Sequence, residues 1–160
     1  MRCSGCRLCE IACSLKHEGI IWPEASRIRI FEPIPGIDIP HLCAQCDEYP
    51  CVNSCPTEAL YVDSTTGAVM VDESRCVLCG KCVVACPGKV PRILPYKKHV
   101  LICDLCGGMP ECVKICNEAG HGALRIIKGS KAKDYKVFAR EPHKVADELA
   151  KHVYAGEVPE

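Results

Sequence analysis

The residues best suited to chemistry in this chain are its 16 cysteines, which fall into four groups of four. In every quartet two residues separate the first pair of cysteines and three separate the last pair, while the middle gap is two, four or five residues. The quartets begin 40, 33 and 27 residues apart, which indicates an internal repeat of one small cysteine-bearing unit. The quartets are Cys3, Cys6, Cys9 and Cys13; Cys43, Cys46, Cys51 and Cys55; Cys76, Cys79, Cys82 and Cys86; and Cys103, Cys106, Cys112 and Cys116.

This spacing suits 4Fe-4S clusters. Such a cluster takes four thiolates at the corners of a tetrahedron, and a loop with cysteines three apart can supply three of them. The run C-x2-C-x2-C-x3-C-P is typical of bacterial ferredoxins, in which the fourth cysteine binds the other cluster of a pair. Pro56 and Pro87 follow the second and third quartets, whereas Ser14 and Asn117 stand in that place after the first and fourth. The 16 cysteines predict four 4Fe-4S clusters with no cysteine left over.

Disulfides and zinc are the two alternative uses of these cysteines. Cysteines three apart rarely pair with each other, and four similar triplets form an unusual disulfide framework. Structural zinc takes two separated C-x2-C pairs per site, which leaves the third cysteine of each triplet surplus. The six histidines are scattered along the chain, and four clusters served by cysteine do not need them as ligands.

Short elements must hold these cysteines in place. The last two cysteines of each quartet are four residues apart, so one helical turn puts both on the same face. Gly5 and Gly80 give two of the cysteine loops the backbone freedom to turn tightly. One longer amphipathic helix is expected at Pro142–Val153, and short strands complete an α+β fold. The expected strands are Ser26–Phe31, Ala59–Val62, Ala68–Val71 and Ala123–Ile127, with a turn at Asp63–Gly67.

The composition excludes several classes of protein. Lys and Arg together number 20, as do Asp and Glu, so the chain lacks the positive charge that a nucleic-acid-binding protein needs. No apolar run reaches the ~18 residues of a membrane-spanning helix, and no signal-peptide segment follows Met1. We therefore expect a cytoplasmic protein. We find no nucleotide-binding loop, serine nucleophile or spare cysteine, so no substrate chemistry is visible.

The motifs resemble a known family. CAQCDEYPCVNSCPTEALYVD, followed by VMVDESRCVLCGKCVVACP and HVLICDLCGGMPECVKIC, is similar to the four-cluster ferredoxin-like subunits of molybdenum and tungsten oxidoreductases, some hydrogenases and related anaerobic redox complexes. CRLCEIACSLKHEG, PEASRIRIF and PGIDIPHLCAQC are similar to the small iron–sulfur subunit of tungsten aldehyde oxidoreductases, and comparable subunits accompany benzoyl-CoA reductases. The resemblance implies an electron-transfer subunit that is not an enzyme by itself.

The resemblance also implies a nested arrangement of duplicated ferredoxin-like modules. Quartets one and four would form an outer two-cluster module and quartets two and three an inner one, with each fourth cysteine crossing to the partner quartet. Pairing of quartet one with two and of three with four is the alternative. The implied ligands are Cys3, Cys6, Cys9 and Cys116 for cluster 1; Cys13, Cys103, Cys106 and Cys112 for cluster 2; Cys43, Cys46, Cys51 and Cys86 for cluster 3; and Cys55, Cys76, Cys79 and Cys82 for cluster 4.

The partners follow from the same resemblance. A large catalytic tungsten- or molybdenum-pterin subunit would stand on one side of the chain, and a further redox subunit or soluble electron carrier on the other. A tungsten partner would oxidise an aldehyde to a carboxylic acid. A free polyferredoxin stays open as an alternative, as do an iron–sulfur subunit of a molybdopterin oxidoreductase, benzoyl-CoA reductase or hydrogenase complex, and self-association.

The chain divides into two regions. Residues 1–127 hold all the cysteines and form the expected four-cluster domain, and residues 128–160 form a C-terminal tail with one helix. Lys128, Lys131 and Lys133 make the start of this tail basic, and we expect the tail to be a docking segment. Members of the family usually have a strand before the first cysteine, so we expect residues to be missing before Met1.

Overall fold

The structure, a computed structural model, describes residues 2–127 and 140–153. These residues form short helices and two small sheets, which is the mixed α+β architecture that the sequence predicts. The helices are α1 (Leu8–Glu18), α2 (Pro50–Asn53), α3 (Lys81–Ala85), α4 (Glu111–Glu118) and α5 (Pro142–Val153), with 3-10 turns η1 (Pro23–Ala25) and η2 (Leu105–Gly108). The strands are β1 (Arg29–Ile34), β2 (Ile37–His41), β3 (Leu60–Val62) and β4 (Val69–Val71).

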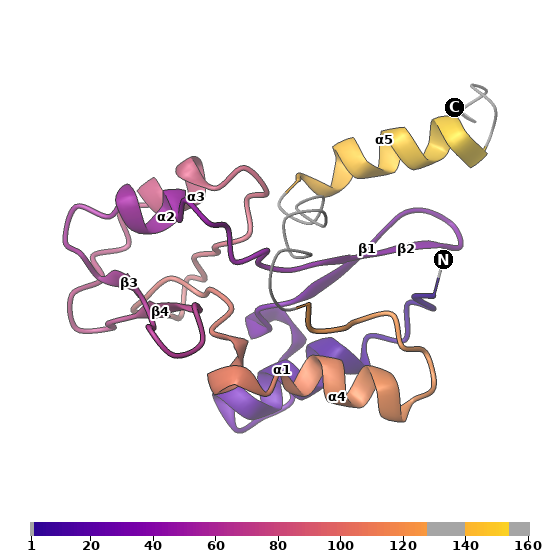
Figure 1. The fold of residues 1–160 in the computed structure, drawn as a ribbon, viewed down its shortest axis with the longest axis horizontal. Coiled ribbons are helices and arrows are strands. Elements are labelled where there is room, and N and C mark those ends of the chain that lie inside the picture. The colour runs from indigo at the N-terminus through magenta and orange to yellow at the C-terminus, as the bar shows by residue number, and fades with distance from the viewer. Residues whose placement is uncertain (1, 128–139, 154–160) are drawn as a thin grey trace.

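The elements gather into two halves. In Figure 1, α1 and α4 lie side by side below the β1–β2 hairpin, whereas α2, α3 and the β3–β4 hairpin form the other half. Each half has its own small core, and cysteine side chains make up a large part of both. Ile28, Ile30 and Leu124 join four cysteines in the first core. The chain therefore packs its apolar side chains around the cysteines rather than apart from them.

Helix α1 is longer than the single turn that the cysteine spacing predicts. Its end is set at Gly19, whose φ is 71° and whose backbone N–H donates to the carbonyl of Leu15 at 3.0 Å. The helix also holds the hairpin in place through Glu10, which is buried. Its Oε1 accepts a 2.7 Å hydrogen bond from the backbone N–H of Ile30. Satisfying a buried carboxylate in this way ties α1 to β1.

Both sheets are antiparallel hairpins. In the smaller one Leu60 faces Val71 and Val62 faces Val69, which confirms two predicted strands to within one residue. Asp63 closes the turn between them, since its Oδ2 accepts the backbone N–H of Thr66 at 2.7 Å. The predicted turn is therefore also confirmed.

The larger hairpin differs from the prediction. Strand β1 begins at Arg29 rather than at residue 26, because the Ser26 hydroxyl donates to the carbonyl of Ile28 at 2.6 Å and bends the preceding backbone. Its partner β2 was not predicted. Pro40, which faces Ile30, argues against a central strand, but in a two-stranded sheet every strand is an edge and tolerates proline.

The predicted strand Ala123–Ile127 is wrong. Within the described residues this segment has no strand assignment and no strand pairs with it. Leu124 is buried in the core beside α1 and α4, so the segment is held by packing rather than by a backbone ladder.

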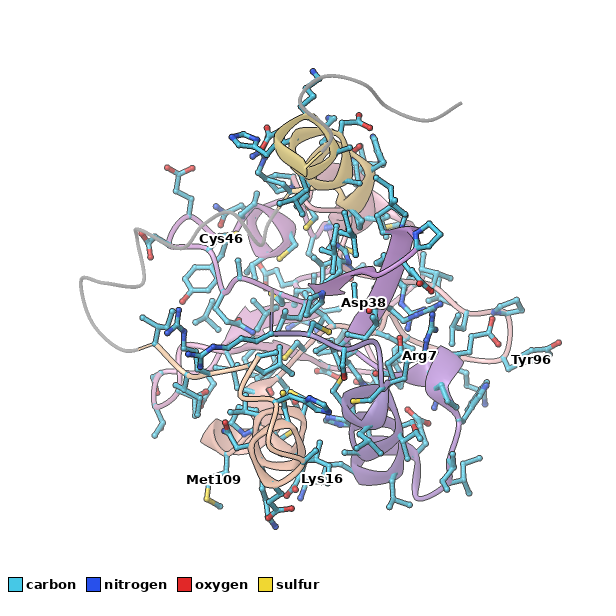
Figure 2. The ribbon with its side chains drawn as sticks, turned by 90° about the vertical axis from the view of Figure 1, so that its right-hand side faces the viewer. Arg7, Lys16, Asp38, Cys46, Tyr96 and Met109 are labelled. Atoms are coloured by element: carbon cyan, nitrogen blue, oxygen red, sulfur yellow. The ribbon has the colours of Figure 1, made fainter. Side chains whose placement is uncertain are left out.

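Helix α5 has the bounds that the sequence predicts. Ala146 and Ala150 are buried, and Ala146 packs against Ile37 and Ile39 of β2. Figure 2 shows α5 above the hairpin that carries Asp38. None of the described helices combines the length and apolar character needed to cross a membrane. The basic residues Lys128, Lys131 and Lys133 lie outside the described residues.

Candidate iron–sulfur centres

The four cysteine loops share one backbone feature. The residue just before the second cysteine has a positive φ in every quartet, and in three of them it is not glycine. A non-glycine residue rarely adopts this conformation, and such strain gathers at functional sites. Only in the first quartet does the sequence itself indicate this conformation, because glycine adopts a positive φ readily. The four residues are Gly5 (φ 67°), Gln45 (φ 49°), Leu78 (φ 55°) and Leu105 (φ 55°).

The last two cysteines of each quartet are placed by a helix. Helix α1 carries Cys9 and Cys13, and α4 carries Cys112 and Cys116. In the other half the helices are shorter: α2 ends before Cys55 and α3 ends before Cys86, which caps it. A single turn is enough to place the third cysteine and to direct the fourth away from its own loop.

Three hollows bring together cysteines that are distant in the sequence. Each is lined by the first three cysteines of one quartet and the fourth cysteine of another, and the empty volumes are similar, about 330, 350 and 330 Å³. The shared lining of four cysteines suits occupants of one kind. We call the sets group 1 (Cys3, Cys6, Cys9, Cys116), group 3 (Cys43, Cys46, Cys51, Cys86) and group 4 (Cys55, Cys76, Cys79, Cys82).

The remaining cysteines form group 2. Cys13 lies close enough to Cys103, Cys106 and Cys112 to raise the pKa of each thiol, after burial, which is the largest cause. The four groups contain all 16 cysteines, none of which is in a disulfide. They have the composition that the nested arrangement requires, and the structure brings no cysteine of quartet one into a group with quartet two.

The groups run in series through the molecule. Because α1 carries Cys9 of group 1 and Cys13 of group 2, it joins those two groups. Cys43 of group 3 lies near Cys103 of group 2. Burial is the largest cause that raises the pKa of the Cys43 thiol, and the charge of Cys103 raises it further. Helix α2 then joins group 3 to group 4, since Cys51 belongs to one and Cys55 to the other. The order is therefore 1–2–3–4.

Burial makes these sites poor places for free thiolates. It raises the pKa of Cys9 and of Cys103 to about 12 and that of Cys51 to about 11. Without a cation, such thiols stay protonated at neutral pH. A bound metal reverses this balance, because its positive charge stabilises the thiolate. The groups thus suit a cofactor that brings iron into the pocket.

Backbone N–H groups point at several of the sulfurs. The N–H of Arg27 donates to Sγ of Cys13 at 3.2 Å, and the N–H of Val90 donates to Sγ of Cys86 at 3.4 Å. Such bonds stabilise a thiolate and are one means of setting the potential of an iron–sulfur cluster. The donor set and its surroundings therefore fit 4Fe-4S clusters.

One histidine lies beside a cysteine group. The Nε2 atom of His17 is 3.6 Å from Sγ of Cys106 and 3.4 Å from Oδ1 of Asp104. Burial, followed by the charge of Arg27, lowers the pKa of His17. Since group 2 already has four cysteines, His17 is a neighbour that can donate to a ligand sulfur. No local pattern in the sequence indicates this role, because His17 is 89 residues from Cys106.

Comparison with known proteins agrees with this chemistry. The 4Fe-4S dicluster domain matches residues 37–124, and a second 4Fe-4S binding domain matches residues 1–16. The chain belongs to the 4Fe-4S dicluster family. It binds multiple 4Fe-4S clusters, as the sequence predicts.

The chain is 61% identical to the polyferredoxin-like subunit of an aliphatic sulfonate oxidoreductase from Pyrococcus furiosus, over 96% of this chain and 88% of that protein. It is 35% identical to a thiosulfate reductase electron transfer subunit of Salmonella typhi, over 72% of this chain and 67% of that protein. It is 36% identical to the beta subunit of an NADH-dependent phenylglyoxylate dehydrogenase of Aromatoleum evansii, but covers only 28% of it. The chain is an electron-transfer, iron–sulfur subunit of an oxidoreductase complex and not a catalyst by itself.

Proposed function

We propose that the chain carries electrons through four 4Fe-4S clusters between a large catalytic subunit of the tungsten aldehyde oxidoreductase type and a second redox partner. The observation that carries the proposal is the series of four cysteine groups, whose end groups hold the two exposed cysteines, Cys6 and Cys79. When bound, the clusters supply reversible one-electron redox chemistry. The chain fixes their spacing, burial and hydrogen bonds.

The proposed ligand sets are groups 1 to 4, one group to each cluster. Support comes from the three hollows lined by crossed sets of cysteines and from the influence of Cys13 on the thiols of quartet four. The helices α1 and α4 then each supply ligands to clusters 1 and 2, so a change in the angle between these helices moves both sites together.

We also assign the fold to two duplicated ferredoxin-like modules, with residues 1–127 as the cluster domain and 128–160 as a docking tail. The repeated positive φ before the second cysteine of all four quartets supports a common origin of the loops. The tail proposal rests on α5, whose exposed face opposite Ala146 and Ala150 is open to a partner.

The Pyrococcus furiosus relative favours a second candidate for the catalytic partner. At 61% identity, that relative points to a subunit that acts on aliphatic sulfonates rather than aldehydes. With either catalytic partner, this chain would accept or supply single electrons. They differ only in the substrate of the large subunit.

Purification of the native complex tests the proposal. A tag on this chain should retain a large subunit that contains tungsten under anaerobic conditions. The complex should then reduce an artificial acceptor with an aldehyde, or with an aliphatic sulfonate if the second candidate is right. Molybdenum in place of tungsten would contradict the named partner. A chain that stays alone at native expression levels would instead indicate a free polyferredoxin.

A further inference from the structure

The exposed end of group 4 has an unusual charge pattern. From residue 42 to residue 74 the sequence has six acidic residues and no basic one, and from Arg75 to Lys98 it has six basic residues and no acidic one. The second stretch carries the loop that supplies three cysteines of group 4. The segment that supplies these three cysteines therefore carries only positive charges, and Glu58, which lies between two residues that line the same hollow, is paired with Arg75.

We define the α3 surface as the six exposed residues between Cys76 and Val90. They mix apolar and basic side chains around an exposed cysteine of group 4, and none is acidic. Val77 and Cys79 line the hollow of group 4, and Ile93, which is 39% exposed, lies against the same hollow. The α3 surface consists of Val77, Cys79, Lys81, Val84, Pro87 and Lys89.

The two lysines flank α3 in the sequence, and Lys89 follows four residues after Ala85, the last residue of the helix. Lys81 is its first residue and Val84, which is 75% exposed, is one turn further on the same side. The Nζ atom of Lys89 donates to the carbonyl of Val84 at 2.7 Å. This bond brings the second ammonium group next to the exposed valine. The exposed side chain of Val84 therefore lies near the ammonium group of Lys89 and one helical turn from Lys81.

Two other basic residues of this stretch are paired with acidic side chains, unlike Lys81 and Lys89. Arg75 pairs with Glu58 at 3.1 Å, and Lys97 pairs with Glu18. In the part of the chain that the structure describes, neither Lys81 nor Lys89 has an acidic partner among its ion pairs and hydrogen bonds. Their charges are thus available to another molecule.

The opposite end of the series is built differently. Cys6 of group 1 is also exposed, but the neighbouring Arg7 pairs with Glu10 at 3.7 Å. The carboxylate of Asp38 lies against Gly5 in the same loop, and Ser4 bonds His121 at 3.2 Å. Within the described residues the polar groups at this end are largely engaged by the chain itself.

We propose that the α3 surface is the docking site for a redox partner protein with an acidic surface around its own redox centre. This inference rests on the proposed electron-transfer function and names the partner at one end. A 4Fe-4S cluster of core charge 2+ with four thiolates carries a net charge of 2−, which by itself repels an acidic partner. Lys81 and Lys89 offset that charge, and Val77 and Val84 supply the apolar contact of a small, transient interface.

Binding of an oxidised, acidic ferredoxin to the holo full-length chain tests the proposal without electron transfer. Isothermal titration at low and high salt should give a Kd that rises with salt for the unchanged chain. The double variant K81E and K89E should weaken binding by about tenfold at low salt and lose most of the salt dependence, because each exposed charge pair contributes ~0.2 to 1 kcal/mol.

The matched control is K16E and K114E, two reversals of the same total charge at exposed positions of α1 and α4, in the other half of the molecule. It should bind within about twofold of the unchanged chain. Equal weakening by both pairs would overturn the proposal, because net charge alone would then explain the effect. No salt-dependent binding by the unchanged chain would also overturn it, as would binding of the α3 surface to phosphatidylglycerol vesicles but not to the ferredoxin.

The same samples separate this proposal from the proposed function. Iron content and reduction by dithionite report on the clusters and do not depend on docking. If the clusters are present and reducible but the K81E and K89E variant binds normally, the docking surface is wrong and electron transfer stands. If no preparation holds reducible clusters, the proposed function fails first.

Discussion

The side-chain amide of Gln45 donates a 2.9 Å hydrogen bond to the backbone carbonyl of Cys103. Its Oε1 atom accepts a second hydrogen bond, 3.2 Å long, from the backbone N–H of Val69. One side chain therefore links the loops of quartets two and four and the β3–β4 hairpin. Gln45 also has the positive φ that precedes the second cysteine of every quartet. It lies where group 2 meets group 3, at the middle of the series.

Gln45→Met should destabilise the fold where Gln45 links the loops of quartets two and four. Methionine has a similar volume but leaves the carbonyl of Cys103 and the N–H of Val69 without their partner, at a cost of about 2 kcal/mol in the free energy of unfolding. Denaturant unfolding followed by cluster absorbance measures the change. Asn53→Ala removes an exposed hydrogen bond to the carbonyl of Glu48 and is the control, with a much smaller expected loss. Equal stability of the Gln45 variant and the unchanged chain would show that other contacts hold the two loops together.

Paired cysteine substitutions test the crossed ligand sets. Cys13→Ala combined with Cys106→Ala should remove the iron of one cluster, about four atoms, because both residues belong to group 2. Cys13→Ala combined with Cys9→Ala should affect two clusters and remove about twice as much. Iron and acid-labile sulfide per chain decide between the two outcomes. A smaller loss from the Cys9 and Cys13 pair than from the Cys13 and Cys106 pair would mean that each quartet binds its own cluster.

Glu18 gives the fold a predictable response to acid. Its side chain is 7% exposed, and burial alone raises its pKa, but hydrogen bonds from Lys97 and Arg27 outweigh burial and hold the pKa below the ordinary value of 4.5. Because the pKa is lower in the folded state, the stabilisation is fully present above about pH 4.5 and is lost as the pH falls through the folded-state value.

Glu18→Gln should therefore cost about 2 kcal/mol at pH 7 and progressively less below pH 4.5. The measurement compares the rate of cluster loss in denaturant for the two proteins across this range of pH. Glu148→Gln, which breaks an exposed pair with Arg140, is the control and should change little at any pH. A difference between the Glu18 variant and the unchanged chain that grows in acid would contradict the sign of the pKa shift.

His17 should tune the potential of one cluster. With a proton on Nε2 it donates toward Sγ of Cys106, 3.6 Å away, and a donor to a ligand sulfur favours the reduced cluster. His17→Phe keeps a ring of similar size and should lower one reduction potential by on the order of 40 mV, the equivalent of one hydrogen bond of about 1 kcal/mol. Redox titration followed by electron paramagnetic resonance measures it. His143→Phe on α5 should leave all potentials unchanged, and an unchanged potential for His17→Phe would remove His17 from this role.

Local patterns in the sequence were enough to predict the cysteine quartets, the β3–β4 hairpin and α5. Each of these depends on residues close together in the chain: fixed cysteine spacing, alternation around a turn, or an apolar stripe every three to four residues. The bounds of α5 were predicted to the residue, because Pro142 starts it and the stripe that includes Ala146 and Ala150 continues without a break.

The features that the sequence missed depend on tertiary contacts. Strand β2 contains Pro40 and pairs only because β1 lies beside it. The segment from Ala123 to Ile127 has strand propensity but no partner among the described strands, so it packs Leu124 instead. The left-handed backbone at Leu78 and Leu105 has no residue signature, since the loop geometry around the cysteines imposes it. His17 meets Cys106 only in the folded chain.

The content of iron, acid-labile sulfide and zinc shows whether this chain carries four 4Fe-4S clusters, when it is measured on the full-length chain purified without oxygen from its native complex. We expect about 16 iron and 16 sulfide per chain, with no zinc in stoichiometric amount. About four zinc per chain with no sulfide would contradict it, because the quartets would then be structural zinc sites that carry no electrons.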